Sequence, residues 1–407
     1  MKETKLIFSP ADILLPAFSK DAGAMKRWAV IACDQFTSEL SYWDACRSLI
    51  GDAPSAYRYI MPEAYLGTPR EAEHGETIAS SMAQFSPDGM TTVTGLISLH
   101  RTLPDGQIRR GLIGKMDLEA YSYEVGSHSA IRATEKTVLE RIPPRCRVRS
   151  EAAVELPHIL ILANDTSLFD YAETLCDPAS KLYDFDLMLG GGHVCAHALT
   201  GSALDDMMKK IAAYEQTNPG LTYAMGDGNH SLAAAKAHWE NLKKAGAPMD
   251  HPARYALCEL TPLGDESLVF EPIYRIMKNV DPADLLTALA AVTGKSGDQT
   301  ITVVHRGEAK TVAFTDPTHA LTVGSLQNFL DDYLAAHPTA SCDYIHGKDS
   351  VLKLCEAPDT VGFLLDGMDK AELFPYVEQY GTLPRKTFSM GEADGKRYYL
   401  EARKIVK

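Results

Sequence analysis

The sequence predicts a mixed α/β fold with a large N-terminal domain at residues 1–278 and a smaller C-terminal α/β domain at residues 279–407. Three observations favour this class. Short apolar runs typical of strands alternate with longer helical patterns along the whole chain. At residues 221–244, a strand pattern leads through a glycine-containing turn into an alanine-rich helix. Asp281, a good helix-capping residue, begins a new set of elements near residue 279.

Strands are predicted where short alternating or continuous apolar runs are bounded by turn residues. These runs lie at residues 92–99, 110–114, 160–162, 184–189, 193–195, 221–225 and 254–260, and in the C-terminal part at 300–304, 311–314 and 361–365. Pro104-Asp105-Gly106 and Gly190-Gly191-Gly192 supply turns, so the strands on either side of each turn are expected to form hairpins.

Helices are predicted where apolar residues recur at helical spacing and breakers end the pattern. The predicted helices lie at residues 202–214, 231–244, 324–335, 346–354 and 370–379, and a further helix is expected to begin with Asp281 as its cap and to run through residues 285 and 286 to 292. Ser202 is the expected N-cap of the first, and Gly246 and Pro248 are expected to end the second.

Composition limits the possible functions. The 407 residues carry 40 basic and 54 acidic side chains and a net charge of −14, which argues against a large nucleic-acid interface because such an interface needs a basic face. No apolar run approaches the roughly 20 residues of a membrane helix. The eight cysteines are scattered without a C-x-x-C pair, which favours reduced thiols and a cytoplasmic location. His193 and His197 lie four apart in a predicted hairpin with no carboxylate at helical spacing, so no metal site is predicted from them.

The strongest local pattern is the loop Gly226-Asp227-Gly228-Asn229-His230-Ser231. At the start of a helix, unpaired N–H groups and the helix dipole favour an anion. Gly226 and Gly228 permit positive φ angles and close approach of a ligand. His230 can donate to a phosphate oxygen or move a proton, because its ordinary pKa of about 6.5 is near neutrality. Asp227 can orient His230, accept a hydroxyl proton or hold Mg²⁺.

A second interpretation of this loop needs no ligand. Asp227 would then be a capping residue and His230 an ordinary first-turn residue of a strand-to-helix connection. The loop is neither a Walker loop nor a dinucleotide fingerprint, since both of those glycine spacings are absent.

Together with other segments, the loop resembles the bacterial and archaeal family known only as domain of unknown function 1015. That family resembles the ParB/sulfiredoxin-like superfamily, whose Asp-Gly-His-His-Arg turn binds nucleotide phosphates. Here Asp227-Gly228-Asn229-His230-Ser231 matches this turn, with Asn229 and Ser231 in place of the first His and the Arg. The missing Arg removes a bidentate phosphate clamp.

Four further segments carry the resemblance. They are Ile131-Arg132-Ala133-Thr134-Glu135-Lys136-Thr137, Phe270-Glu271-Pro272-Ile273-Tyr274-Arg275, Leu383-Pro384-Arg385-Lys386-Thr387-Phe388 and the looser Ala32-Cys33-Asp34-Gln35-Phe36. Arg132, Lys136 and Arg275 are expected to clamp an anion, and Glu135 to act as a general base or metal ligand. The alternatives are a solvated helix face for Arg132 and Lys136, a surface ion pair for Arg275 and an inert buried thiol for Cys33.

The resemblance implies a ParB/sulfiredoxin-like core and a nucleotide-dependent phosphotransferase acting on a small hydroxylated metabolite. The superfamily includes a free-serine kinase, so serine or phosphoserine is the expected substrate and ATP or ADP with Mg²⁺ the expected cofactor. His230, Glu135 and Asp227 are the expected catalytic residues, and Gly226, Gly228, Asn229, Ser231, Arg132, Lys136 and Arg275 the expected nucleotide-binding residues. Two alternatives are a non-catalytic nucleotide-binding regulator of the partition-protein type and a scaffold with a vestigial site.

Overall fold

The computed structural model describes residues 5–406, which fold into two compact units. The first unit comprises the described chain up to Leu268, together with Phe374–Thr382 and the described residues from Gly391 onward. The second comprises Val269–Leu373 and Leu383–Met390. The two units therefore interleave along the sequence. Residues 1–4 and 407, which the sequence-based domains include, lie outside the described part of the chain.

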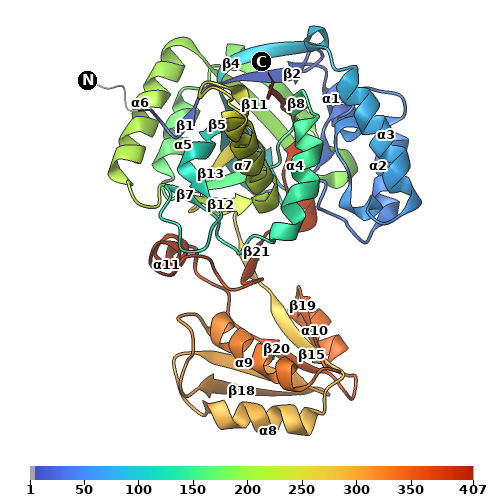
Figure 1. The fold of residues 1–407 in the computed structure, drawn as a ribbon, viewed down its shortest axis with the longest axis vertical. Helices are drawn as coiled ribbons and strands as arrows, with labels where there is room; N and C mark the ends of the chain where they lie inside the picture. Colours follow the sequence, from blue (N-terminus) through green and yellow to red (C-terminus); the bar gives the residue numbers. More distant parts are fainter. Residues whose placement is uncertain (1–4, 407) are drawn as a thin grey trace. The chain divides into compact units, whose positions relative to one another are not determined.

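The first unit is built on a large mixed sheet, which confirms the predicted mixed α/β class (Figure 1). In spatial order its strands are β10 (Lys181–Asp186), β11 (His193–Leu199), β4 (Met90–Thr102), β5 (Ile108–Asp117), β13 (Tyr255–Pro262), β9 (Leu160–Ala163), β12 (Tyr223–Asp227), β7 (Ile131–Arg132) and β6 (Tyr121–Ser122). Two N-terminal strands extend it, β1 (Phe8–Ser9) along β5 and β2 (Ala11–Pro16) along β4. β9 is parallel to β13 but antiparallel to β12, and β12 is parallel to β7.

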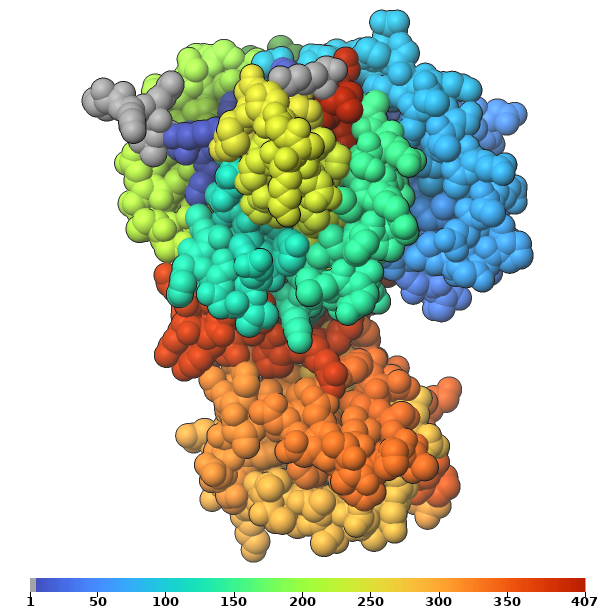
Figure 2. Space-filling model, viewed as in Figure 1, coloured from blue at the N-terminus to red at the C-terminus, as the bar shows by residue number. Residues whose placement is uncertain are grey.

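Helices of the first unit pack on both faces of this sheet. Successive strand residues point to opposite faces, so Leu96 belongs to one apolar cluster and Ile97 to the other. The helices of this unit are α1 (Ala22–Trp28), α2 (Leu40–Ile50), α3 (Pro69–Ala83), α4 (Ile142–Ser150), α5 (Ser167–Thr174), α6 (Gly201–Thr217), α7 (Asn229–Lys244) and, except for its first residue, α11 (Leu373–Tyr380). α4 and α7 lie side by side. Figure 2 shows α7, in yellow, at the surface next to α4. In residues 5–406, no helix is long and apolar enough to cross a membrane.

Both predicted hairpins of this unit are confirmed. β4 and β5 pair antiparallel on either side of the turn at residues 104–106, with Ile97 opposite Ile113. β10 and β11 pair antiparallel around the three glycines. Gly190 and Gly192 there have φ angles of 76° and 85°, which glycine adopts without strain.

Five predicted helix starts differ from the structure, because the backbone angles of single residues set where a helix begins. α9 (Thr322–Ala336) begins two residues earlier than predicted and α11 (Leu373–Tyr380) three residues later. Thr200, not Ser202, is the N-cap of α6, since its extended backbone directly continues β11. α7 begins at Asn229 rather than Ser231, because Gly228 takes the left-handed conformation. α10 begins at Lys348 rather than residue 346, after Gly347 with φ 79°.

The second unit contains an antiparallel sheet with helices. Its strands are β16 (Thr293–Gly294), β18 (Glu308–Phe314), β17 (Thr300–His305), β20 (Val361–Leu364), β15 (Tyr274–Lys278) and β19 (Ser341–Ile345) in spatial order, and its helices are α8 (Pro282–Val292), α9 (Thr322–Ala336) and α10 (Lys348–Leu354). As predicted, Asp281 caps α8 by accepting a hydrogen bond from the Ala283 N–H at 2.9 Å. A short ribbon of β14 (Phe270–Pro272) and β21 (Phe388–Met390) also belongs to this unit.

The C-terminal segment returns to the first unit through two short strand pairs. β22 (Tyr398–Tyr399) pairs antiparallel with β3 (Val30–Ile31), and β23 (Arg403–Lys404) with β8 (Val154–Glu155). In addition, the Ala32 N–H donates to the Arg397 carbonyl at 2.9 Å. Residues 396–399 therefore lie next to the loop that follows β3.

Candidate functional site

The candidate site is built at the connection between β12 and α7. Gly228 is the N-cap of α7 with φ 78° and ψ 28°, a left-handed conformation that disfavours other residues. A Cβ there would lie 3.0 Å from the Ile159 Cα, so glycine also permits close packing on the neighbouring chain. Within the described chain, no side chain caps this helix. Its first N–H groups therefore point to a position where an anion is favoured.

Residues 134–138 pack against this loop. The Thr134 hydroxyl donates to the Met225 carbonyl at 2.9 Å, and the Asn229 amide donates to the Glu135 carbonyl at 3.2 Å. The Val138 N–H donates to His230 Nε2 at 3.3 Å. A neutral His230 ring therefore carries its proton on Nδ1. The structure thus brings the Glu135 segment to the His230 loop.

Asp227 faces a cation from the far end of the chain. Its carboxylate accepts the Gly228 N–H at 2.8 Å and lies 3.3 Å from Lys396 Nζ. Burial would raise the pKa of Asp227, but the charges of Lys396 and His158 and the Gly228 hydrogen bond outweigh burial and hold the pKa below its ordinary value. Asp227 is therefore ionised at neutral pH.

His158 connects the α7 turn to the C-terminal segment. Its Nε2 lies 3.4 Å from the Ser231 hydroxyl, and its Nδ1 lies 2.8 Å from the Tyr399 hydroxyl. The Tyr399 oxygen also accepts the Cys33 N–H at 3.3 Å. These contacts thus link four segments that are distant in sequence, those of Cys33, His158, Ser231 and Tyr399.

Cys33 and Asp34 follow β3 beside this chain of contacts. Burial, reinforced by the neighbouring Asp34 charge, raises the pKa of the Cys33 thiol to about 12. The thiol is therefore protonated at neutral pH, as the inert alternative predicts. Asp34 accepts a hydrogen bond from the Gln35 amide at 3.0 Å.

The Asn229 side chain carries an unpaired acceptor. Its Oδ1 is buried and has no hydrogen-bond partner among residues 5–406, while its amide nitrogen is held by Glu135. An unpaired buried acceptor costs about 1–3 kcal/mol. A hydroxyl or N–H donor of a ligand would remove that cost.

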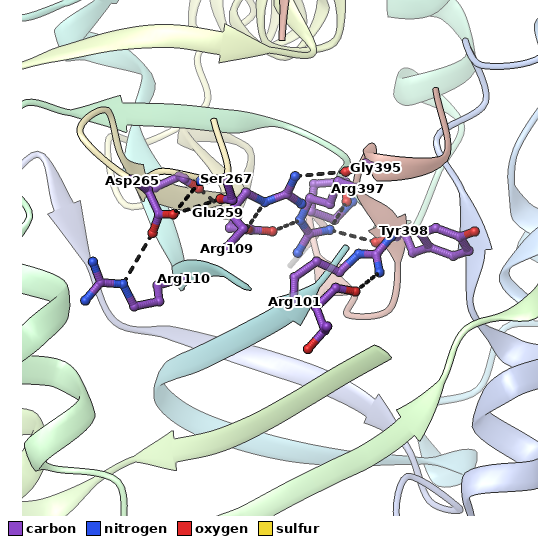
Figure 3. Close-up of polar contacts among 12 residues, drawn as sticks. Arg101, Arg109, Arg110, Glu259, Asp265, Ser267, Gly395, Arg397 and Tyr398 are labelled. Carbon is purple, nitrogen blue, oxygen red and sulfur yellow. Dashed lines mark hydrogen bonds and ion pairs between the residues drawn. The ribbon is translucent and has the colours of Figure 1, made fainter. Parts of the chain in front are cut away.

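A buried network of arginines and glutamates holds the segment that carries Lys396 (Figure 3). Arg101 Nη2 donates to the Asp394 carbonyl at 3.1 Å, and Arg109 Nη1 donates to the Gly395 carbonyl at 2.9 Å. Arg397 is paired with Glu259 at 2.8 Å and with Glu401 at 2.7 Å. The backbone on both sides of Lys396 is therefore fixed from within the core.

The structure shows what surrounds each of the three predicted clamp residues, Arg132, Lys136 and Arg275. Arg132 is buried and donates to the carbonyls of Ser129 and Val377 at 2.8 and 3.4 Å. Lys136 is exposed. Residues 133–138 form a loop after β7, so the alternative of a solvated helix face is wrong.

Arg275 belongs to the second unit. It is fully buried and donates to the carbonyls of Ile273 and Arg385, the latter at 2.9 Å. The alternative of a surface ion pair for Arg275 is therefore wrong.

His158, Lys396 and Tyr399 were not predicted as site residues. His158 carries only a weak signal, a single polar residue ahead of the apolar run of β9. Lys396 stands next to Arg397 and a tyrosine pair, a pattern that a surface strand could equally carry. The pairing of β22 with β3 places Tyr399 beside the loop after β3, and the pairing of β9 with β12 places His158, just ahead of β9, beside Asp227.

Three solved structures have low similarity to this chain. A conserved hypothetical protein from Pyrococcus furiosus is 12% identical, with a TM-score of 0.36 over 70% of this chain and 93% of that chain. A free serine kinase in complex with AMP is 10% identical, with a TM-score of 0.38 over 72% of this chain and 91% of its own. C-terminally truncated SbnI from Staphylococcus aureus is 10% identical, with a TM-score of 0.35 over 72% and 83%. These likenesses are too distant to bear on function.

No curated protein matches this chain in sequence. Residues 17–406 match the family described as Protein of unknown function (DUF1015), which is nearly the whole chain. The chain belongs to the DUF1015 family.

Proposed function

We propose that this protein is a cytoplasmic, nucleotide-dependent phosphotransferase that acts on a small hydroxylated metabolite. The observation that carries the proposal is the uncapped start of α7, beside which Lys396, His158 and His230 gather. Backbone N–H groups, the Lys396 cation and the Nδ1–H of His230 are a donor set suited to a phosphate group. An assignment of the first unit to the ParB/sulfiredoxin-like superfamily belongs to the same proposal and rests on the resemblance of the Asp227–Ser231 loop.

In this mechanism the terminal phosphates of the nucleotide lie against the N–H groups of residues 229–231. Phosphoryl transfer depends mainly on positioning and on offsetting the charge of the transferred group. Lys396 supplies a positive side chain at the turn through its ion pair with Asp227, and the buried arginine network keeps its backbone in place. Because its pKa is lowered, Asp227 is better suited to remain an ionised carboxylate than to accept a proton. Glu135 is then the carboxylate proposed to accept the hydroxyl proton.

Mg²⁺ would arrive bound to the nucleotide phosphates. Within residues 5–406 no three His, Cys, Asp or Glu side chains form a group that could hold a metal ion. A nucleotide-bound Mg²⁺ needs only one or two protein carboxylates, and Asp227 is an ionised carboxylate at the turn. Bound in this way, the ion would neutralise charge on the phosphates.

Phosphorus NMR on the full-length protein tests the proposal. One sample contains ATP, Mg²⁺ and L-serine, and the other contains ADP, Mg²⁺ and phosphoserine. Serine is tested first because of the resemblance described above. We expect phosphate to move between nucleotide and amino acid. Replacing His230 with Ala should reduce the rate by about 10²–10³-fold, the usual cost of removing one hydrogen-bond donor to developing charge, while the melting temperature changes little.

Two outcomes would contradict the proposal. Nucleotide signals that broaden without transfer to any hydroxylated metabolite would favour the non-catalytic regulatory alternative. Absence of nucleotide binding would leave only the scaffold alternative. Unchanged turnover of His230→Ala would remove His230 from the mechanism.

A further inference from the structure

Ser231, His158 and Tyr399 form a chain of contacts in which a hydroxyl faces an imidazole held by a third group. The Ser231 Oγ lies 3.4 Å from His158 Nε2, and the Tyr399 hydroxyl lies 2.8 Å from His158 Nδ1. A nucleophile beside a base that is itself oriented by a third side chain is the usual arrangement for covalent catalysis. Contacts between catalytic groups are often longer before a substrate binds.

The imidazole is held firmly. His158 is 7% exposed and Tyr399 2% exposed, and their rings meet edge to face at 5.4 Å between centroids. Burial, with Cys33 close by, raises the pKa of Tyr399 well above its ordinary value, so its phenol is neutral. With its proton on Nδ1, His158 donates to the phenol oxygen and presents the Nε2 lone pair to the Ser231 hydroxyl.

The surroundings also suit the product of a transfer to Ser231. Ser231 lies in the first turn of α7, is partly exposed, and carries its hydroxyl near the uncapped helix start. A phosphoserine at a helix N-terminus is stabilised by the N–H groups and the dipole. Lys396 lies beside the same turn through its ion pair with Asp227.

We propose that Ser231 is phosphorylated transiently during turnover; this rests on the proposed function and deepens it. Ser231 Oγ attacks the terminal phosphorus of a nucleoside triphosphate, and an O–P bond forms. The bond from that phosphorus to the bridging oxygen breaks, and its electron pair leaves on the nucleoside diphosphate. His158 Nε2 takes the serine proton.

The second step returns the enzyme to its starting state. The hydroxyl oxygen of the metabolite attacks the phosphorus of phosphoserine, and the Ser231 Oγ–P bond breaks. Protonated His158 gives its proton to Oγ, and the metabolite's hydroxyl proton passes to the Glu135 carboxylate and then to water. The protein therefore needs no reactant beyond the nucleotide and the metabolite.

The test incubates the full-length protein with ATP and Mg²⁺ in the absence of metabolite and measures intact mass, followed by peptide mapping. We expect the addition of one phosphoryl group on Ser231 and its loss when L-serine is added. Ser231→Ala should abolish labelling. Ser202→Ala, which removes a serine from the first turn of α6, should leave labelling unchanged. His158→Gln should slow labelling by about 10²–10⁴-fold.

Nucleotide binding measured by calorimetry distinguishes a failure of the covalent step at Ser231 from a failure of the proposed phosphotransferase function. If Ser231→Ala binds ATP and transfers phosphate to the metabolite at the wild-type rate, the covalent step is wrong and the proposed function stands. If wild-type protein binds ATP and turns over without any trace of phosphoserine in rapid-quench samples, the covalent step is also wrong. If wild-type protein binds no nucleotide and gains no mass, both fail.

Discussion

The pKa of Asp227 depends on residues that are distant from it in sequence. Its nearest cation is Lys396, and the His158 charge also acts on it. Burial alone would favour the protonated acid, but these two charges and the Gly228 N–H reverse the effect and lower the pKa. The side chain of Lys396 is 12% exposed and that of Asp227 22%, so solvent screens their ion pair only in part.

The lowered pKa of Asp227 predicts a contribution to acid stability. The folded state favours the ionised carboxylate, so the stabilisation is complete above the unfolded pKa of about 3.9 and is lost as the pH falls through the lower folded value. In Asp227→Asn this contribution is absent. The melting temperature of the wild type should therefore fall more steeply than that of Asp227→Asn between about pH 5 and pH 3. Asp52→Asn, an exposed control, should keep the wild-type slope, and parallel curves for wild type and Asp227→Asn would contradict the assigned pairing.

The connection between β12 and α7 illustrates what an element pattern can predict. Its apolar strand, glycine turn and alanine-rich helix are all present, with the helix starting two residues earlier than predicted. Helix ends depend on the backbone angles of single residues, here the φ of 78° at Gly228. A glycine in sequence permits such an angle without requiring it, so the helix start could not be derived from the pattern.

Gly228→Ala should destabilise the first unit for two reasons. A non-glycine residue in the left-handed region costs about 1–2 kcal/mol. In addition, the new Cβ would meet the Ile159 Cα at 3.0 Å, a backbone atom that cannot move freely. Gly246→Ala is the matched control at the other end of α7, where φ is 93° and nothing lies within 4 Å of the added Cβ. Thermal and urea unfolding should show a larger loss of stability for Gly228→Ala, and equal losses would exclude the clash.

At the scale of the whole molecule, the C-terminal segment returns to the first unit and contributes residues both to its core and to the candidate site. Arg397 from this segment pairs with Glu259 of β13 and with Glu401, both fully buried. Tyr183 donates a further hydrogen bond to Glu401 at 2.5 Å. Burial lowers the pKa of Arg101 to about 10, with the neighbouring Arg109 acting in the same direction, and Arg101 still remains charged at neutral pH. The charged network therefore links the last strands to the centre of the sheet.

Arg397→Met should leave the buried Glu401 carboxylate without its cation and leave Glu259 with Arg109 alone, at 3.6 Å. Removing one partner of a buried ion pair costs about 3–5 kcal/mol, because the remaining charge stays in a poorly solvated place. Urea unfolding of the first unit should show a loss of that order. Lys404→Met, an exposed change in the same C-terminal segment, should alter stability by less than about 0.5 kcal/mol. Combining Arg397→Met with Glu259→Gln and Glu401→Gln should restore part of the lost free energy of unfolding, because no unpaired carboxylate is then buried. No recovery would show that Arg397 stabilises the protein through packing rather than through its charge.

The sequence by itself determined the mixed α/β class, most helices and strands, both hairpins and the loop at the start of α7. Those features follow from local periodicity and from turn residues, which act over a few neighbouring positions. The role of the predicted clamps stays a prediction, although Arg132 and Arg275 are buried against protein carbonyls. Only the tertiary structure decided that His158, Lys396 and Tyr399 meet the loop. The reason is physical. The pairing of β9 with β12 positions His158, and the pairing of β22 with β3 and a buried charge network position Tyr399 and Lys396. Such long-range contacts depend on burial in the complete fold rather than on any local pattern.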